Sequence, residues 1–233
     1  MRLSVFLLVL GLCACGQKPD GTQAAAPPAA EAAPDDPAAD MKDDTPVVVM
    51  LGDSLTAGYN LPAGNALPAA LQRAFNEDGV KAKFVNAGVS GDTTADGLNR
   101  YDWSVTGTNA AVLVVALGAN DFLQGVAPEI PKKNLAAILT RAKEDDIAAV
   151  LVGVQIPGDG PNGQNDAREA AYAAIYPALA KEFDVPYFSN MLAPVAGKAG
   201  LLQQDGLHPT ADGVEAMAGE LASFLEPLVK DLP

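Results

Sequence analysis

The stretch VVVMLGDSLTAGYNL, residues 47–61, places an acid and a hydroxyl directly behind an apolar run. Val47 to Leu51 predict a buried strand, because all five residues are apolar and both faces of an extended chain are therefore apolar. Asp53 and Ser54 follow, between two glycines that permit a tight turn. The strand thus delivers a hydroxyl to one edge of the predicted sheet.

The same alternation continues along the chain, where short apolar runs predict strands and longer helix-period segments lie between them. The strand segments are 47–51, 82–85, 111–117, 148–154 and 186–188, and the helical segments are 66–78, 92–101, 132–145, 165–183 and 211–229. Strand and helix in alternation, with right-handed crossovers, predict an α/β fold: a three-layer sandwich with a five-stranded parallel sheet, flavodoxin-like. One domain, residues 46–233, accounts for the pattern.

The N-terminus predicts a processed signal. Arg2 precedes an apolar stretch, 3–12, that is too short to span a bilayer. The tetrad Leu12-Cys13-Ala14-Cys15 resembles the bacterial lipoprotein box, which implies a signal peptide of residues 1–14, lipidation of Cys15 and a lipid-anchored protein of the cell envelope. The alternative is an ordinary secretory signal and a secreted or periplasmic protein.

The segment 15–45 predicts a disordered tether, because it is rich in Ala, Pro and Asp and contains no aromatic residue with which to build a core. Gly16 follows the candidate lipidation site, where an inner-membrane retention signal usually has aspartate. The outer membrane is therefore the favoured location of the anchor.

Composition excludes several kinds of function. The formal net charge of −14, with no basic run, argues against nucleic acid as a partner. Both cysteines, Cys13 and Cys15, precede the predicted domain, which therefore has no thiol nucleophile and no cysteine metal site. His208 is the single histidine, so a histidine-based zinc site lacks ligands and any catalytic imidazole must be His208.

In open parallel sheets, ligands bind beyond the carboxyl ends of the strands. The segments that follow the predicted strands are 52–54, 86–92, 118–121, 155–160 and, after a longer irregular stretch, 205–209. Together they carry a hydroxyl, glycines, an amide, acids and an imidazole, a combination that favours acyl transfer.

Each of these groups has a predicted role. Ser54 is the candidate nucleophile and His208 its base, while Asp205, three residues before the histidine, is close enough to hold the ring in the required tautomer. The candidate donors to an oxyanion are the side-chain amide of Asn120 and the N–H groups of Gly91 and Ser54. This chemistry requires no metal and no organic cofactor.

Four motifs together resemble the sequence blocks of the SGNH (GDSL-type) hydrolases: GDSL at 52–55, SGDT at 90–93, GAND at 118–121 and DGLH at 205–208. The flanking text LGDSLTAGY, NAGVSGDTT and AIYPALAKEFDVP is most similar to the bacterial acyl thioesterase, lysophospholipase and arylesterase subgroup. The resemblance spans 46–230, implies the SGNH hydrolase fold, and gives Ser54, Asp205 and His208 as the triad and Ser54, Gly91 and Asn120 as the oxyanion hole.

Several neighbouring residues have structural interpretations. Asp53 is expected to start a helix, Asp121 to cap a helix or to hydrogen-bond the rim, and Asp92 with Thr93 and Thr94 to form an N-cap cluster. Trp103 is expected to pack in the interior. For Tyr59, packing and a position beside the pocket both stay open.

The resemblance implies acyl esters, thioesters or lysophospholipids as substrates. The segments beside the rim, 122–126, 156–163 and 191–195, carry several apolar side chains and no basic cluster, which favours an uncharged or acyl-chain substrate. The glycine-rich part, 158–163, is a candidate lid. The alternatives are a carbohydrate O-deacetylase of the same fold and a non-catalytic lipoprotein that binds lipid or sugar. A flavodoxin-like phosphate site leaves Asn120 and His208 unexplained, and no G-x-S-x-G motif supports an α/β-hydrolase.

Overall fold

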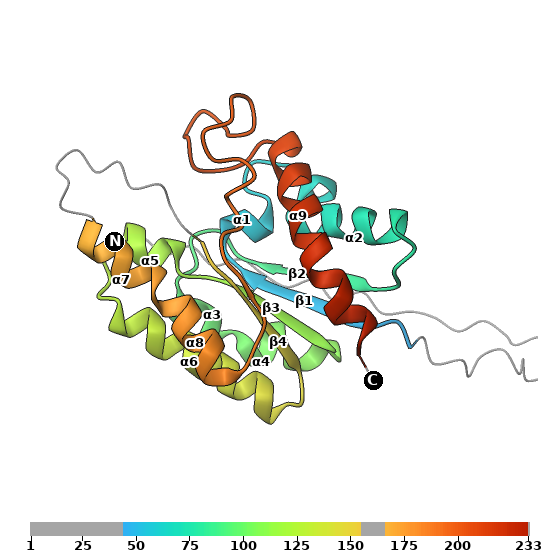
Figure 1. Cartoon of the computed structure of the whole chain (residues 1–233), viewed down its shortest axis with the longest axis horizontal. Coiled ribbons are helices and arrows are strands. Elements are labelled where there is room, and N and C mark those ends of the chain that lie inside the picture. Colours follow the sequence, from blue (N-terminus) through green and yellow to red (C-terminus); the bar gives the residue numbers. More distant parts are fainter. Residues whose placement is uncertain (1–43, 155–165, 233) are drawn as a thin grey trace, which may run out of the picture. The chain divides into compact units, whose positions relative to one another are not determined.

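A computed structural model describes residues 44–154 and 166–232. Its sheet has five strands in the order β2-β1-β3-β4-β5, and every neighbouring pair is parallel. The strands are β1 (Val47–Gly52), β2 (Lys83–Gly88), β3 (Val112–Ala116), β4 (Ala148–Val152) and β5 (Tyr187–Phe188) (Figure 1). The predicted α/β fold is confirmed.

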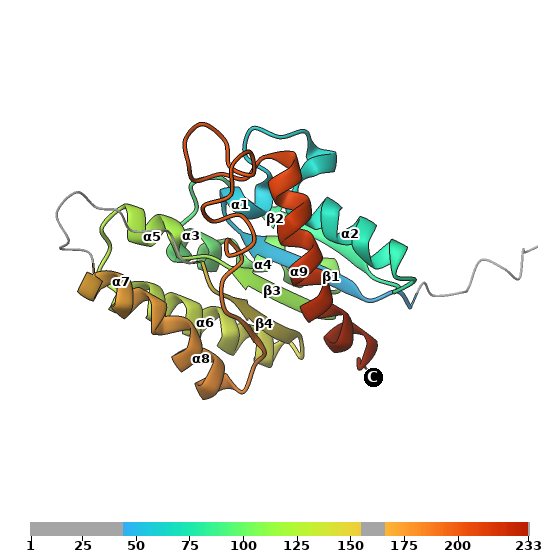
Figure 2. The same ribbon diagram turned by 45° about the horizontal axis from the view of Figure 1, so that its top comes forward.

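Helices cover both faces of the sheet (Figure 2). One layer contains α2 (Leu67–Glu77) and α9 (Ala211–Lys230), and the other contains α3 (Thr94–Asn99), α4 (Tyr101–Ser104), α6 (Glu129–Glu144), α7 (Asp166–Ala173) and α8 (Ile175–Phe183). Side chains of β1 alternate between the layers: Val48 and Met50 pack in the core with α2 and α9, whereas Val49 and Leu51 pack with α6 and α8. The period of two in an extended chain therefore gives β1 two buried faces.

Short helices fill the connections: α1 (Ser54–Ala57), η1 (Ala63–Asn65), η2 (Thr106–Thr108) and α5 (Ala119–Leu123). Two of the predicted helices are each divided in two. The segment 92–101 becomes α3 and α4, which meet at Arg100, and the segment 165–183 becomes α7 and α8. The second break precedes Pro177, which has no N–H to donate to the carbonyl four residues earlier.

Three strands end at the same level of the sheet. Gly52, the last residue of β1, is in register with Gly88 at the end of β2 and with Ala116 at the end of β3. The next strand in the chain, β2, lies on one side of β1, and the following strand, β3, lies on the other side. The strand order therefore reverses at β1, and its carboxyl end is the usual place for a ligand in such sheets.

The predicted signal peptide, Cys15 and the tether up to residue 43 lie outside the described residues, and so does the segment 156–163 with its candidate lid at 158–163. Among the helices that are described, none has both the length and the apolar character needed to cross a bilayer.

Trp103 was expected to pack in the interior, and this prediction is wrong. It lies on α4 with 82% of its surface exposed, although its neighbour Tyr101 is completely buried. A helix of four residues has room to bury only one side, and Tyr101 occupies it.

Candidate active site

The turn after β1 presents Ser54 at the start of a helix. Asp53 is the N-cap of α1 and its Oδ1 accepts a hydrogen bond of 3.0 Å from the N–H of Leu55, as expected of a helix-start residue. Gly58 ends the helix in the left-handed conformation, with φ of +80°. Ser54 is thus the first helical residue, and its N–H is one of those that an α-helix leaves without an internal partner.

The backbone of β2 passes directly against this short helix. A Cβ on Gly88 would lie only 2.4 Å from the backbone nitrogen of Ala57, so only glycine allows the approach. This contact fixes α1 against the end of the sheet and thereby limits the positions that Ser54 can take.

Ser54, His208 and Asp205 are joined by hydrogen bonds. Oγ of Ser54 is 2.9 Å from Nε2 of His208, and Nδ1 of the same ring is 2.7 Å from Oδ2 of Asp205. The structure therefore brings together three residues of which two are 154 positions apart in the chain. The hydroxyl contacts one ring nitrogen and the carboxylate the other, which is the geometry of a nucleophile, a base and an orienting acid.

Asp205 is held in its ionised form by backbone donors. Its Oδ1 accepts from the N–H groups of His208 and Leu207, each at 3.0 Å. These two bonds, with the bond from His208 first, lower the pKa of Asp205 to about 2. The carboxylate that faces the imidazole is consequently charged throughout the neutral range.

The loop of His208 is tied to the loop that follows α1. Nε2 of Gln203 donates to the carbonyls of Tyr59 and Pro209, at 2.9 and 2.8 Å, and the N–H of Gln203 donates to the carbonyl of His208 at 2.7 Å. The ring of Tyr59 stacks at a tilt on that of His208, with centroids 4.4 Å apart, so Tyr59 borders the site. Sequence reasoning missed Gln203, because no local motif marks it.

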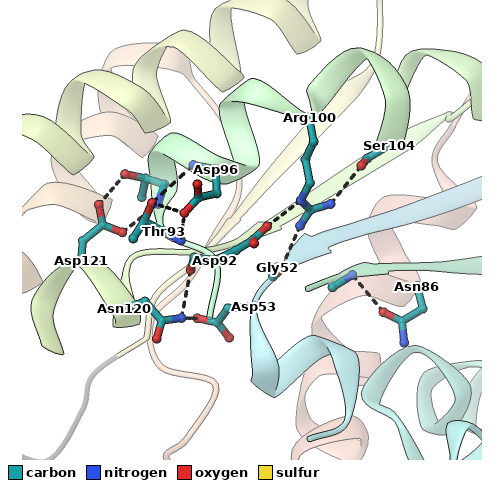
Figure 3. Close-up of polar contacts among 12 residues, drawn as sticks. Gly52, Asp53, Asn86, Asp92, Thr93, Asp96, Arg100, Ser104, Asn120 and Asp121 are labelled. Atoms are coloured by element: carbon teal, nitrogen blue, oxygen red, sulfur yellow. Dashed lines mark hydrogen bonds and ion pairs between the residues drawn. The ribbon is translucent and has the colours of Figure 1, made fainter. Parts of the chain in front are cut away.

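Asn120 and Gly91 lie in the loops after β3 and β2. Nδ2 of Asn120 donates to the carbonyl of Asp92 at 2.9 Å and is 3.5 Å from Oδ2 of Asp53 (Figure 3). Gly91 is exposed and has φ of +92°, a backbone conformation that favours glycine. The amide of Asn120 is thus bonded directly to the residue that follows Gly91.

The remaining polar residues of these loops support them. Thr93 caps α3 in a capping box with Asp96, so Thr93, rather than Asp92, is the helix cap within the predicted cluster. The carboxylate of Asp121 accepts from the N–H and the hydroxyl of Thr94, both at 2.7 Å, which agrees with its predicted hydrogen bond at the rim. Asp92 instead forms an ion pair with Arg100.

Asp53 is an acid in an interior position, with only 1% of its surface exposed. Burial, more than any neighbouring charge, raises the pKa of Asp53 to about 6, against the bond from Leu55 and the attraction of His208, which lower it. Its protonation therefore changes at a pH close to neutral.

A pocket of about 60 Å³ opens beside Ser54 and His208. Its other lining residues are Leu55, Ala119, Asn120, Leu123, Leu192 and Leu207. Two of the segments expected to set specificity therefore contribute one leucine each. Larger hollows at the amino ends of the strands contain none of the candidate catalytic residues. Within residues 44–154 and 166–232, no group of three or more histidine, cysteine, aspartate or glutamate side chains is placed to hold a metal ion.

Comparison with known proteins agrees with the family resemblance of the four sequence motifs. The model of the GDSL-like lipase/acylhydrolase family matches residues 50–216. The thioesterase 1/protease 1/lysophospholipase L1 of Escherichia coli (strain K12) is 36% identical over 182 residues, which cover 78% of this chain and 84% of that protein. An arylesterase of Vibrio mimicus is 32% identical, over 76% of this chain and 89% of that protein. The crystal structure of TesA superposes with a TM-score of 0.72 at 31% identity and covers 78% of this chain and 99% of that one.

Proposed function

Because the chain belongs to the GDSL-like lipase/acylhydrolase family, we propose that it is a serine esterase that cleaves carboxylic esters or thioesters of acyl chains through an acyl-enzyme. The observation that carries the proposal is the hydrogen bond of 2.9 Å between Oγ of Ser54 and Nε2 of His208. A serine hydroxyl is a weak nucleophile until a base at this distance accepts its proton.

In the proposed reaction, Oγ of Ser54 attacks the carbonyl carbon of the substrate while its proton moves to Nε2 of His208. The leaving alcohol or thiol then takes that proton, and the acyl group stays on Ser54. A water molecule gives a proton to the same nitrogen and attacks the acyl-enzyme. The carboxylic acid is then released as its bond to Oγ of Ser54 breaks and Oγ takes the proton back from Nε2. Asp205 accepts the Nδ1–H bond throughout, which keeps Nε2 free to act as the base and stabilises the imidazolium.

The negative oxygen of each tetrahedral intermediate needs donors fixed in advance. In the proposal these are the N–H of Ser54 at the start of α1, the N–H of Gly91 and Nδ2 of Asn120. All three belong to loops that leave the sheet at one level, because Gly52, Gly88 and Ala116 are in register. Each such donor is worth about 10²-fold to 10³-fold in rate.

The pocket favours an uncharged acyl group as the part of the substrate beside Ser54. Leucines 55, 123, 192 and 207 line it, and no basic side chain does. Leu123 and Leu207 are 54% and 37% exposed, so they offer apolar surface to a longer chain at the mouth of the pocket. Thioesterase, lysophospholipase and arylesterase are the activities that the relatives' names carry, and acyl thioesters, lysophospholipids and aryl esters are the substrates proposed here.

The test is hydrolysis of p-nitrophenyl esters of increasing acyl length by the wild type and by Ser54→Ala. The kcat of the variant should be lower by at least about 10³-fold, because the nucleophile is absent although the substrate can still bind. Ser223→Ala is the matched control: the hydroxyl of this exposed serine of α9 donates to the carbonyl of Gly219, and its loss should leave kcat unchanged. Equal activity of wild type and Ser54→Ala would refute the proposal, and activity confined to sugar acetates would favour a deacetylase.

We also propose that the protein is attached to a membrane of the cell envelope through a lipid on Cys15, as the tetrad Leu12 to Cys15 indicates. Cys15→Ser should move the protein from the membrane fraction to the soluble fraction of the producing cell, whereas Cys13→Ser should not. An unchanged distribution of Cys15→Ser would contradict the anchor.

A further inference from the structure

Arg100 contacts two of the loops that carry proposed catalytic groups, at Gly52 and at Asp92 (Figure 3). Its Nε donates to Oδ2 of Asp92 at 2.6 Å, and its Nη2 donates to the carbonyl of Gly52 at 2.9 Å. The remaining terminal nitrogen, Nη1, donates to Oγ of Ser104 at 2.9 Å. Three nitrogens of one planar group are therefore each directed at a different acceptor.

The contacts are sheltered from water. The side chains of Arg100 and Asp92 are 14% and 12% exposed, whereas those of Arg73 and Glu215, an ion pair at the surface, are 43% and 54% exposed. Exposed pairs contribute little, because water and salt compete for both charges. Water and salt compete less for the ion pair of Arg100 and Asp92. The carbonyl of Gly52 is a second, uncharged acceptor that orients the guanidinium group.

The two ends of this bridge lie next to the proposed donors. Gly52 is two residues before Ser54, and its carbonyl also accepts from the N–H of Val89 at 3.1 Å. Asp92 directly follows Gly91, and its own carbonyl accepts from Nδ2 of Asn120. Through Arg100 and Asp92, the loops of all three proposed oxyanion donors form one hydrogen-bonded network.

Gly91 depends on such a network because packing does not hold it. Within the described part of the chain, no atom beyond Gly91 and its two chain neighbours lies within 4 Å of the place where a Cβ on Gly91 would be. The residue is exposed, and its φ of +92° is reached by glycine without strain but is not imposed by glycine. The N–H of Asp92 closes the turn that contains Gly91 by donating to the carbonyl of Val89 at 3.2 Å, and the carboxylate and carbonyl of Asp92 bond to Arg100 and Asn120. The direction of the Gly91 N–H is therefore set by the bonds of its neighbour, Asp92.

We propose that Arg100 is a positioning residue that holds the N–H of Gly91 at a fixed place relative to Ser54, by joining the carboxylate of Asp92 to the carbonyl of Gly52. The proposal rests on the function proposed above, since it assigns Gly91 to the oxyanion. Only a planar fork reaches both acceptors and Ser104 at once; a lysine at this position would offer one ammonium group and would lose the geometry while keeping the charge.

A purely structural role would look different. If Arg100 only stabilised the junction of α3 and α4, its loss would lower the melting temperature and leave kcat of the folded molecules unchanged. A positioning role lowers kcat at a temperature where every variant is folded, with little change in KM, because the displaced donor binds the transition state more strongly than the substrate.

The experiment compares Arg100→Met and Arg100→Lys with Arg73→Met in hydrolysis of a short-chain p-nitrophenyl ester. Arg73 is the matched control, because it too joins a carboxylate, that of Glu215, to a carbonyl, that of Gly64, but does so at the surface. We expect Arg100→Met to lower kcat by about 10-fold to 100-fold with KM within about twofold, since a small displacement of a catalytic group suffices for such losses. Arg100→Lys should regain less than half of the kcat that Arg100→Met loses, and the kcat of Arg73→Met should match that of the wild type.

The position of Gly91 is also measured directly, through its amide peak in a ¹⁵N–¹H correlation spectrum. The peak should shift or broaden in Arg100→Met and Arg100→Lys and stay in place in Arg73→Met. An unchanged kcat and an unchanged Gly91 peak in Arg100→Met would overturn the positioning role, even with Ser54→Ala inactive as the proposed function requires. A wild type without Ser54-dependent activity would instead overturn the proposed function, and the Gly91 peak would still decide whether Arg100 fixes this loop.

Discussion

Asp53 should destabilise the folded protein at neutral pH, and replacing it by asparagine should remove that effect. The carboxyl group is buried, with 1% of its surface exposed, and Oδ1 accepts from the N–H of Leu55 at 3.0 Å. The amide of Asn120 lies 3.5 Å from Oδ2, which is too long for a strong bond. Charge on this group is therefore poorly compensated.

The size of the effect follows from proton linkage. Burial raises the pKa of Asp53 from 3.8 to about 6 in the folded state. Between these two pH values the folded protein binds more protons at this residue than the unfolded chain does, so the free energy of unfolding falls as pH rises. The contribution is most favourable below pH 3.8 and is lost by about pH 6. A shift of about two units corresponds to about 3 kcal/mol.

Asp53→Asn keeps the size of the side chain and an oxygen to accept from Leu55, and it removes the charge. At pH 8 the variant should be more stable than the wild type by about 1 to 3 kcal/mol, and at pH 3.5 the two should be nearly equal. Urea unfolding at both pH values measures this. Asp102→Asn is the control, because the side chain of Asp102 is 74% exposed and no such gain is expected there.

The opposite result would show that the reasoning is wrong. If the difference in stability between wild type and Asp53→Asn is the same at pH 3.5 and at pH 8, Asp53 does not titrate across this window in the folded state. Asp205, whose pKa is lowered to about 2, loses its favourable contribution as pH falls from 3.8 towards 2, but it does so in the wild type and in Asp53→Asn alike and therefore cancels in their difference.

Two further predictions concern the proposed machinery. Asp205→Asn places an amide against Nδ1 of His208, and this amide no longer fixes the tautomer of the ring. The kcat should therefore fall by about 10³-fold to 10⁴-fold while the circular dichroism spectrum stays unchanged. A kcat within tenfold of the wild type would contradict the role of Asp205. In Gly91→Ala, the new Cβ has room, since no atom of the described structure beyond the two chain neighbours lies within 4 Å of it, but a φ of +92° is unfavourable for alanine. The backbone at residue 91 should therefore change its conformation, and kcat should fall by about 10²-fold with KM nearly unchanged. Wild-type kinetics would remove Gly91 from the proposed oxyanion hole.

The sheet and the meeting of the four motifs were predictable because both follow from strand ends. An apolar run of five to seven residues predicts a strand without knowledge of its neighbours, and parallel strands bring their carboxyl ends to one edge. Ser54 and His208 could therefore be placed together although they are far apart in the chain. The same argument placed Asn120 beside the loop of Gly91, and its bond to Asp92 agrees with it.

Other features depend on contacts that no local pattern encodes. Arg100 bonds to the carbonyl of Gly52, 48 residues away, and any residue type has such a carbonyl. Gln203 bonds to the carbonyl of Tyr59, 144 residues away. For the same reason, no signal in the sequence marks this bond. Trp103 was misplaced because its residue type alone does not show which side of α4, a helix of four residues, faces the core.

The burial of Asp53 also bears on the proposed role of Asn120 as an oxyanion donor. Of the two acceptors around its Nδ2, Asp92 is at 2.9 Å and Asp53 at 3.5 Å, so the hydrogen directed at Asp53 is the one an oxyanion can take with little loss. An ionised Asp53 would repel the negative oxygen at that place. Because burial raises the pKa of Asp53 to about 6, this repulsion is weak below about pH 6 and grows as the carboxyl group ionises above it. The ionisation that lowers stability at neutral pH therefore also opposes charge development beside Asn120.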